Sequence, residues 1–478
     1  MSFAVALMLA FALGAALYLL VERPRSQAGV VVLCAHAIVL GLLACAIVIR
    51  LPAALGHTAL PPSTWAWPAV ALLLIAPFAV RAWRLAPWPV AAQPPVPAMP
   101  AWTRGCVVAL WLLIALRLAW FYEEAWLRPL FGWDAWLAWS AKAKAWVGSG
   151  QALPFVDAGE WWTLPPGEAR TSLAHHYPEL PSWLQVWLAN ASGDWHERYV
   201  NLAWPTLWLA LVVGCYGQWR QLGASVLLAS IGAYFLASLP LANVHAALPG
   251  YMDLWVATLV TFAALAIVRW RQESDPRQLV LAVVLACVLP ALKLEGMVWA
   301  IGLLALAAWF CLERYPRHIR SIAVLGCVAA LLLVSWLFDL PWLSLLVELV
   351  AAGRDGIGTG DVLVSTAKGL WTQGNWQLLW YLVPAVVLLR WRTLRSAPAL
   401  SGVAMLLAAG MALLVILFLG TTAGRWAESF TAVNRLVLHL APLAVSLMVL
   451  LLRGSLSAAE AQAPIPAVSD RPVRDTAR

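Results

Sequence analysis

Charged residues are scarce in this sequence, and paired cysteine motifs are missing from it. Only 11% of its 478 residues are Asp, Glu, Lys or Arg, whereas 63% are hydrophobic and the mean hydropathy is +0.80. A water-soluble domain of this composition would expose large apolar patches. The seven cysteines form no CxxC pair and lie within or beside apolar runs, so we interpret them as small core residues rather than metal ligands or a disulfide framework.

The sequence instead contains many long apolar runs. Many approach the roughly 20 residues with which a helix crosses a bilayer. The sequence therefore predicts an all-α polytopic membrane protein of about 13 transmembrane helices, with its N-terminus outside. The predicted spans are about 2–20, 28–49, 65–80, 104–121, 197–218, 222–242, 252–268, 278–292, 296–312, 321–340, 376–390, 400–420 and 434–452.

The net charge of +8 does not indicate nucleic-acid binding, because the basic residues follow this topology. Short arginine clusters recur on one side of the predicted spans, which the positive-inside rule makes cytoplasmic. Most acidic residues fall at the outer ends of spans, where we expect the polar chemistry.

We divide the chain into three parts. Residues 1–103 hold three N-terminal spans and a stiff Pro-rich cytoplasmic linker, residues 104–452 the main transmembrane module, and residues 453–478 a disordered cytoplasmic tail. Two outer connections, 122–196 and 341–375, are too long to be turns. We expect them to carry function or helices of their own.

The segment GWDAWLAWSAKAKAW, residues 132–146, begins with a single acid, Asp134. As a regular helix it would face the membrane surface with one broad aromatic arc, made of Trp133, Trp136, Trp139 and Trp146. Asp134 would stand on the opposite, alanine-lined face, where a substrate could approach closely. Aspartate is also a favoured helix N-cap, and both roles remain open. Lys142 is expected to be solvated or to extend to the interface.

Further along the same loop comes HHYPELPSWLQVW, residues 175–187, a proline-fixed turn followed by a second amphipathic segment. His175, His176 and Glu179 are candidate ligands of a divalent metal, although their spacing is not that of an established site. Tyr177 and Glu179 are also candidates for supporting a catalytic site.

Two outer turns between spans carry further candidates. Asp253 lies at or just inside the membrane, where an acid is costly and usually functional. Lys293 and Glu295 stand in the hairpin ALKLEGMVW. They either form an ion pair that closes the hairpin, or Lys293 binds a phosphate at the membrane edge while Glu295 orients it.

Arg425 and Arg435 fall on the outer side, against the positive-inside rule, and therefore need anionic partners. Arg435 and His439 are four residues apart and share a helix face. A guanidinium forks onto two phosphate oxygens, so a lipid phosphate suits Arg435. The alternative is a salt bridge to Glu428 or another outer acid.

The order of these motifs resembles that of bacterial membrane glycosyltransferases of the GT-C superfamily, particularly those with a KNEG-like hairpin. The matching features are an aspartate in a large first outer loop, then YPELP, GYMDL and KLEG, all within residues 104–452. Wider relatives are protein O-mannosyltransferases and the aminoarabinose transferases of lipid A. Two departures stand out: Asp134 is a single acid where many relatives have two, and Leu294 replaces the Asn of KNEG.

This resemblance implies a GT-C-like helical bundle with amphipathic helices in a catalytic first loop. It also implies transfer of a sugar, with inversion, from a polyprenyl-phosphate donor to an extracytoplasmic glycan, lipid or protein at the bacterial inner membrane. Asp134 would be the general base. The donor phosphate would be bound by Lys293, Arg435, Arg425 and Arg198. The supporting residues would be Glu295, Asp253, Tyr177, Glu179 and Lys142, and no cofactor is specified, although a divalent metal is compatible with this scheme.

Two other classes of function fit parts of the pattern. A transporter or flippase of a lipid-linked precursor also explains charges at span ends, but it predicts polar residues deep in the bundle and inverted repeats. Apart from Arg117 and Asp339, the spans are apolar through their middles. A glycan ligase or polymerase would use the same outer arginines and a lipid-phosphate donor. A scaffold has no need of a lone acid on an alanine face.

Overall fold

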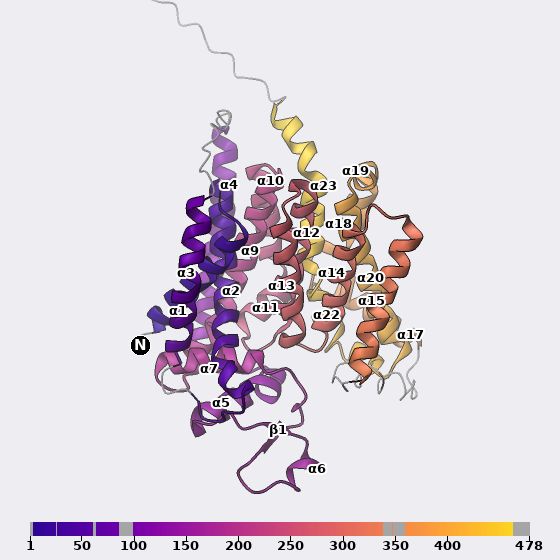
Figure 1. Ribbon diagram of the computed structural model, residues 1–478. Helices are drawn as coiled ribbons and strands as arrows, with labels where there is room; N and C mark the ends of the chain where they lie inside the picture. Colours follow the sequence, from indigo (N-terminus) through magenta and orange to yellow (C-terminus); the bar gives the residue numbers. More distant parts are fainter. Residues whose placement is uncertain are drawn as a thin grey trace, which may run out of the picture.

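The computed structural model describes residues 3–24, 26–60, 64–85, 99–337, 347 and 359–461. Most of these residues are helical, and the long helices stand side by side in one bundle (Figure 1). Most of the predicted Pro-rich linker, the first part of the 341–375 connection, Asp339 and most of the predicted tail lie outside the described residues. The two strands, β1 Phe155–Val156 and β2 Arg170–Thr171, pair in parallel within the first long loop.

The described residues form the helices that follow, in chain order. They are α1 Phe3–Val21, α2 Gln27–Ala54, α3 Ala66–Leu85, α4 Ala101–Leu127, α5 Ala141–Ser149, α6 Ala158–Trp161, α7 Leu180–Ser192, α8 Glu197–Asn201, α9 Ala203–Gln221, α10 Val226–Ala237, α11 Pro240–Ala247, α12 Asp253–Glu273, α13 Pro276–Leu292, α14 Gly296–Cys311, α15 Arg317–Leu337, α17 Thr359–Ala367, α18 Leu379–Leu389, α19 Trp391–Ser396, α20 Pro398–Gly420, α21 Gly424–Glu428, α22 Val433–Leu438 and α23 Ala441–Ala461. Two π-helical segments, Ala135–Ser140 and Lys368–Thr372, precede α5 and follow α17.

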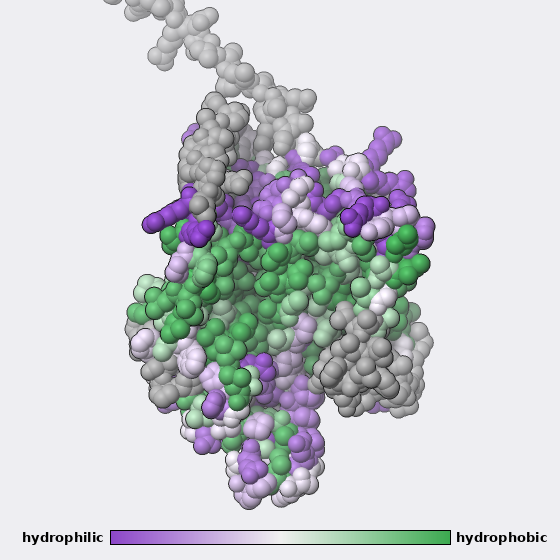
Figure 2. All heavy atoms as spheres, viewed as in Figure 1, coloured by the Kyte–Doolittle hydropathy of each residue, from purple (hydrophilic) through white to green (hydrophobic). Residues whose placement is uncertain are grey.

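The chain is an all-α polytopic membrane protein. Eight helical segments in the described residues are long and apolar enough to cross a bilayer, and α10 with α11 makes a ninth if this pair, bent by 63°, is one span. On the face shown in Figure 2, an apolar belt surrounds the bundle between hydrophilic residues at its two ends. Each predicted span overlaps a helix in its described part, but α13, α14 and α18 are shorter apolar helices, and α15 is not among the eight. The number of 13 crossings therefore stays a prediction.

The three N-terminal helices belong to the same core as the rest. Buried apolar side chains form one continuous cluster from Ala6 in α1 to Leu451 in α23. α2 packs against α9 and α7 as well as against α1. Small residues permit the closest contact, because a Cβ at Gly14 would lie 2.0 Å from the carbonyl oxygen of Ala37. Of the cysteines, Cys45 and Cys215 are core residues as expected, whereas Cys106, Cys287, Cys311 and Cys327 are exposed on the bundle surface.

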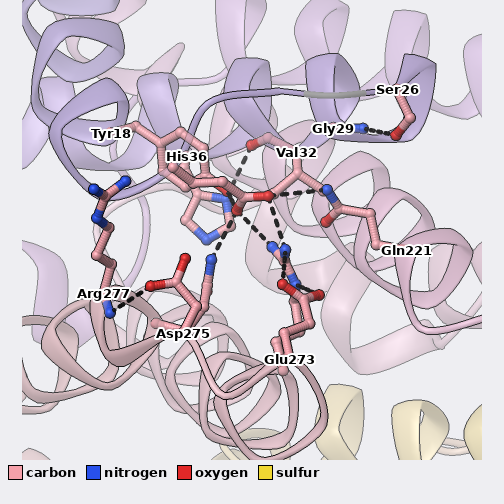
Figure 3. Close-up of polar contacts among 12 residues, drawn as sticks. Tyr18, Ser26, Gly29, Val32, His36, Gln221, Glu273, Asp275 and Arg277 are labelled. Atoms are coloured by element: carbon pink, nitrogen blue, oxygen red, sulfur yellow. Dashed lines mark hydrogen bonds and ion pairs between the residues drawn. The ribbon is translucent and has the colours of Figure 1, made fainter. Parts of the chain in front are cut away.

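A polar cluster that the sequence did not indicate joins α1 to α12 and α13. Arg269 donates from Nη1 and Nη2 to the two oxygens of Glu22, at 2.6 and 2.8 Å, and the two side chains are only 4% and 12% exposed. We call this group the Glu22 clamp; its other members are Tyr18, Gln221, Glu273 and Gln278. Figure 3 shows Tyr18, Gln221 and Glu273 converging on the same point. The clamp fixes one end of α12, and Asp253 begins the other.

Candidate functional site

The centre of the candidate site is the carboxylate of Asp253, the first residue of α12, which is completely buried. Lys293 Nζ donates to Oδ1 at 2.8 Å, and Arg435 donates to Oδ2 from Nη2 and Nε at 3.0 and 3.2 Å. A helix N-terminus also favours a negative charge at this position. A buried acid is tolerated only with such partners. The expectation of a special role for Asp253 thus has a structural counterpart, since it gathers the cations of two other segments.

His439 is the third partner of Asp253, and its tautomer follows from its other contact. Trp299 donates its indole N–H to Nδ1 of His439 at 2.8 Å. Nδ1 must therefore be the accepting nitrogen, and the ring proton lies on Nε2. Nε2 is 3.1 Å from Oδ1 of Asp253, so a neutral His439 donates to the carboxylate. The predicted shared face of Arg435 and His439 is confirmed by their common partner.

Arg435 connects the buried carboxylate of Asp253 to the partly exposed carboxylate of Asp134. Its Nη2 lies 2.6 Å from Oδ2 of Asp134, and its guanidinium stacks 4.4 Å from the ring centroid of Tyr251. The Asp134 side chain is 32% exposed, against 0% for Asp253. The five residues Asp134, Asp253, Lys293, Arg435 and His439 are called the Asp253 cluster below. Glu428 is not its partner, but the alternative of a salt bridge to another outer acid is confirmed, because Arg435 pairs with Asp134 and Asp253.

Two glycines allow the first outer loop to reach this cluster. A Cβ at Gly250, whose φ is +102°, would lie 2.2 Å from the Cβ of Ala135. A Cβ at Gly132 would lie 2.4 Å from Cε2 of Tyr251. The backbone on either side of Asp134 therefore lies directly against the turn that leads into α12, and any larger side chain would separate them.

Asp134 is not a helix cap. It has helical dihedral angles, φ −65° and ψ −29°, and its side chain makes no capping hydrogen bond to the described backbone. The N-cap interpretation is therefore wrong. The carboxylate instead points to Arg435, and about a third of it is left open to approach.

The expected aromatic arc after Asp134 is also wrong. Trp133 and Trp136 are 63% and 49% exposed, but Trp139 and Trp146 are buried, and Trp139 donates to the carbonyl of Pro178 at 3.1 Å. The reason is local, since residues 135–140 form a π-helix whose wider turn breaks the 100° periodicity assumed for an α-helix. Ala138 is buried as well, so the alanine face is not open along its whole length.

Lys142 is completely buried, which corrects the expectation of a solvated lysine. Its Nζ donates to the carbonyl oxygens of His175 and Tyr177 at 2.8 and 2.9 Å. Burial lowers the pKa of Lys142 to about 8, although the charge of Glu179 acts in the opposite direction. Lys142 therefore holds the turn at 175–177 in place and acts on the site through Tyr177.

Tyr177 stands beside the Asp253 cluster. Its ring packs edge-on against Trp139, with centroids 5.5 Å apart. Burial raises the pKa of its phenol, and the negative charges of Glu295 and Asp134 raise it further, so the hydroxyl stays protonated. Glu295 itself lies 3.3 Å from Lys293. The ion pair expected across the hairpin is thus confirmed, with Lys293 shared between Glu295 and Asp253.

Three of the named residues lie apart from the cluster. Arg425 is exposed in α21, and no ion pair links it to the cluster within the described residues. Arg198, in α8, stacks over Trp126 at 5.8 Å. Glu179 lies 3.9 Å from Arg50 at the end of α2.

No group of three His, Cys, Asp or Glu side chains in the described part of the chain is placed to hold a metal ion. His175, one of the three proposed ligands, directs Nδ1 to the carbonyl of Ser172 at 3.2 Å. The proposed ligands His175, His176 and Glu179 therefore do not converge on one point.

Sequence reasoning missed His245, Tyr251 and Trp299. His245 lies in the last turn of α11 with Nδ1 3.9 Å from Oδ2 of Asp253, and Trp299 orients His439 from α14. The Pro-Gly pair before Tyr251 signals a sharp turn that folds α11 back beside α12. That signal could have placed His245 near the acid, but nothing in the sequence pairs Trp299 with His439.

Comparison with protein-family models, curated proteins and solved structures finds no match to this chain. What the chain does is therefore argued from the site alone.

Proposed function

We propose that this protein is a membrane glycosyltransferase that moves a sugar from a polyprenyl-phosphate donor to a hydroxyl outside the cytoplasm. The observation that carries the proposal is the fork of Arg435 between a partly exposed carboxylate and a fully buried one. A purely structural pair would not need one of its acids to stand open at a loop. The GT-C-like bundle, the placement in a bacterial inner membrane and the extracytoplasmic face of the site belong to the same proposal.

The donor phosphate competes with Asp134 for Arg435. Asp134, Asp253 and Glu295 already neutralise Lys293 and Arg435, so the cluster has no surplus positive charge before the donor arrives. A phosphate that pairs with Arg435 leaves Asp134 without its cation and more able to take a proton. Asp253 keeps the guanidinium and the Lys293 ammonium in position throughout, because it is shielded from water.

The chemical step is a single displacement. The acceptor O–H gives its proton to Asp134 while its oxygen forms a bond to the anomeric carbon. The bond from that carbon to the phosphate oxygen breaks, and the polyprenyl phosphate leaves with the electron pair. Arg435 and Lys293 stabilise the charge that develops on the leaving oxygen. Tyr177, held by Lys142, donates its protonated hydroxyl to the reacting groups.

The test uses the whole protein in nanodiscs with radiolabelled polyprenyl-phosphate sugars. We expect Asp134→Asn to lower the release of polyprenyl phosphate by about 10²–10⁴-fold, as loss of a general base does. The matched control is Glu160→Gln, an exposed acid of the same loop in α6, which should keep wild-type turnover. Turnover by Asp134→Asn equal to wild type would refute the assigned base.

Tight donor binding without turnover in wild type would favour the second candidate, a transporter or flippase of a lipid-linked precursor. With a polyprenyl-pyrophosphate-linked oligosaccharide as donor, release of polyprenyl pyrophosphate and transfer of the whole glycan would indicate a ligase. A transporter needs no base, so the Asp134→Asn comparison separates it from the transferase, whereas a ligase carries out the same displacement and is separated by the product that it releases.

A further inference from the structure

A pocket of about 650 Å³ lies beside the first outer loop, between the end of α4, α5 and α8. Its volume falls within the roughly 300–1,000 Å³ of small-molecule sites. Its wall includes three aromatic side chains, Trp126, Trp195 and Tyr199, and none of its lining residues belongs to the Asp253 cluster. Interfacial aromatic belts lie on outward surfaces. Here the aromatic residues instead surround a hollow.

The charge of the pocket wall is predominantly positive. Arg128, Lys144 and Arg198 stand against a single carboxylate, Glu197. Lys144 is 63% exposed and 3.9 Å from Glu197, and Arg128 pairs with Glu124 outside the pocket lining. The charge of Lys144 is thus only weakly compensated. Arg198 stacks on the ring of Trp126.

Hydrogen bonds join the segments that line the pocket. Glu197 accepts from the backbone N–H of Leu130 at 2.9 Å, and Asn201 donates to the carbonyls of Ala125 and Arg128 at 3.2 and 3.1 Å. A preformed wall lowers the ordering cost of binding. Trp195 adds a buried indole N–H that has no hydrogen-bond partner among the described residues.

We propose that this pocket binds an acidic saccharide, with its sugar rings on the indole faces and its carboxylate or phosphate on Lys144 and Arg198. Flat aromatic faces suit the C–H faces of sugar rings, and the guanidinium and ammonium groups suit the anion. The choice of a sugar over other ring-bearing anions rests on the proposed function. The pocket is close in the chain to the proposed base, because Pro129 in the pocket wall precedes Asp134 by five residues. The pocket thereby selects an acidic acceptor for the transfer.

Binding of the saccharide is measured without any donor, so its outcome does not depend on whether the protein transfers a sugar. The full chain in phosphatidylcholine nanodiscs is titrated by calorimetry with tetragalacturonate, with neutral maltotetraose and with AMP as an anion whose ring system is not an oligosaccharide. We expect tetragalacturonate to bind at least tenfold more tightly than either. Equal binding of maltotetraose overturns the anion contacts, and equal binding of AMP overturns the choice of a saccharide.

Variants locate the binding. Lys144→Gln with Arg198→Gln should weaken tetragalacturonate binding at least tenfold, and Trp126→Leu should also weaken it. Lys368→Gln, an exposed cation outside the pocket lining, is the control and should bind as wild type. Unchanged affinity in the double variant overturns the site. If a uronic-acid glycolipid in the nanodisc competes with tetragalacturonate, the ligand is lipid-linked. If it does not compete, the ligand is a free saccharide. Both results are consistent with the proposed pocket.

Discussion

The carboxylate of Asp253 makes hydrogen bonds to three side chains from two other segments of the chain, Lys293 after α13 and Arg435 and His439 at α22, and has no exposed surface. Removing one member of a buried ion pair leaves its partners charged in a medium that cannot solvate them. Asp253 is therefore a positioning residue. It sets where the Lys293 ammonium and the Arg435 guanidinium stand, and Asp134 depends on it through Arg435.

We expect Asp253→Asn to destabilise the protein by about 3–5 kcal/mol, the usual loss when one partner of a buried pair is removed. Denaturant unfolding in detergent micelles measures this. Glu168→Gln, an exposed acid of the first outer loop, should leave the midpoint unchanged. A midpoint for Asp253→Asn equal to that of the control would contradict the central place given to this carboxylate.

Lys142 predicts a pH dependence. Its pKa is about 8 in the folded chain and 10.5 in an unfolded one. Between these values the unfolded chain binds more protons, so the free energy of unfolding should rise with pH from about 8 to 10.5 and stay level below 8. Lys142→Met should lack this rise. The difference between the two pH profiles, measured by denaturant unfolding, isolates Lys142 from the other titrating groups, and parallel profiles would contradict the prediction.

At the scale of single residues, the sequence identified most of the cluster but not its connections. Asp134, Asp253, Lys293 and Arg435 were found because charged residues are rare at span ends and need a reason to be there. Which acid pairs with which cation could not be predicted, since Arg435 and Asp253 are 182 positions apart and no local pattern relates them. Lys142 was misjudged because its two partners are backbone carbonyls, which leave no trace in a sequence.

At the scale of elements, apolar length predicted the helices well, whereas distortions within them were missed. The prediction of one span at 222–242 did not foresee the 63° bend between α10 and α11, where Pro240 begins the second helix. The π-helical turn after Asp134 was missed for a related reason. An extra residue per turn follows from tertiary contacts such as the bond of Trp139 to Pro178, which override the local preference for a regular helix.

The meeting of the first outer loop with α12 should be intolerant of added volume. Gly250→Ala places a Cβ 2.2 Å from that of Ala135 on a backbone with positive φ, and we expect a destabilisation of about 1–3 kcal/mol together with loss of turnover. Gly148→Ala is the matched control, because its Cβ would meet nothing within 4 Å. Thermal unfolding and the donor-cleavage assay check both. Wild-type behaviour of Gly250→Ala would show that the loop does not need this contact.

At the scale of the whole molecule, α12 is the axis of the arrangement. Its 21 residues span about 30 Å, with the Asp253 cluster at one end and the Glu22 clamp at the other. The three N-terminal helices, which the sequence set apart from the rest of the chain, share one core with the other helices, and α1 is joined to α12 by the clamp.

Loosening the clamp should release α1 without touching the site. We expect Glu22→Gln to destabilise the protein by about 3 kcal/mol and to raise hydrogen exchange in α1, because Arg269 stays charged and buried. Glu273→Gln, the 41% exposed partner of the same arginine, should change stability by less than about 1 kcal/mol. Equal destabilisation by the two variants would contradict the larger contribution assigned to Glu22.

The clamp also has a consequence for the order in which the chain is made. Glu22 leaves the ribosome 247 residues before Arg269, a delay of roughly 12–50 s at about 5–20 residues per second. During that interval α1 and α2 can pack against each other, and α3, α7 and α9, which precede Arg269 in the chain, can add to this assembly. The contact between Gly41 and the carbonyl of Ala10, where a Cβ would come within 1.9 Å, provides an early docking surface of small residues. The pair of α1 and α2 can thus assemble before Arg269 is synthesised and forms its ion pair with Glu22.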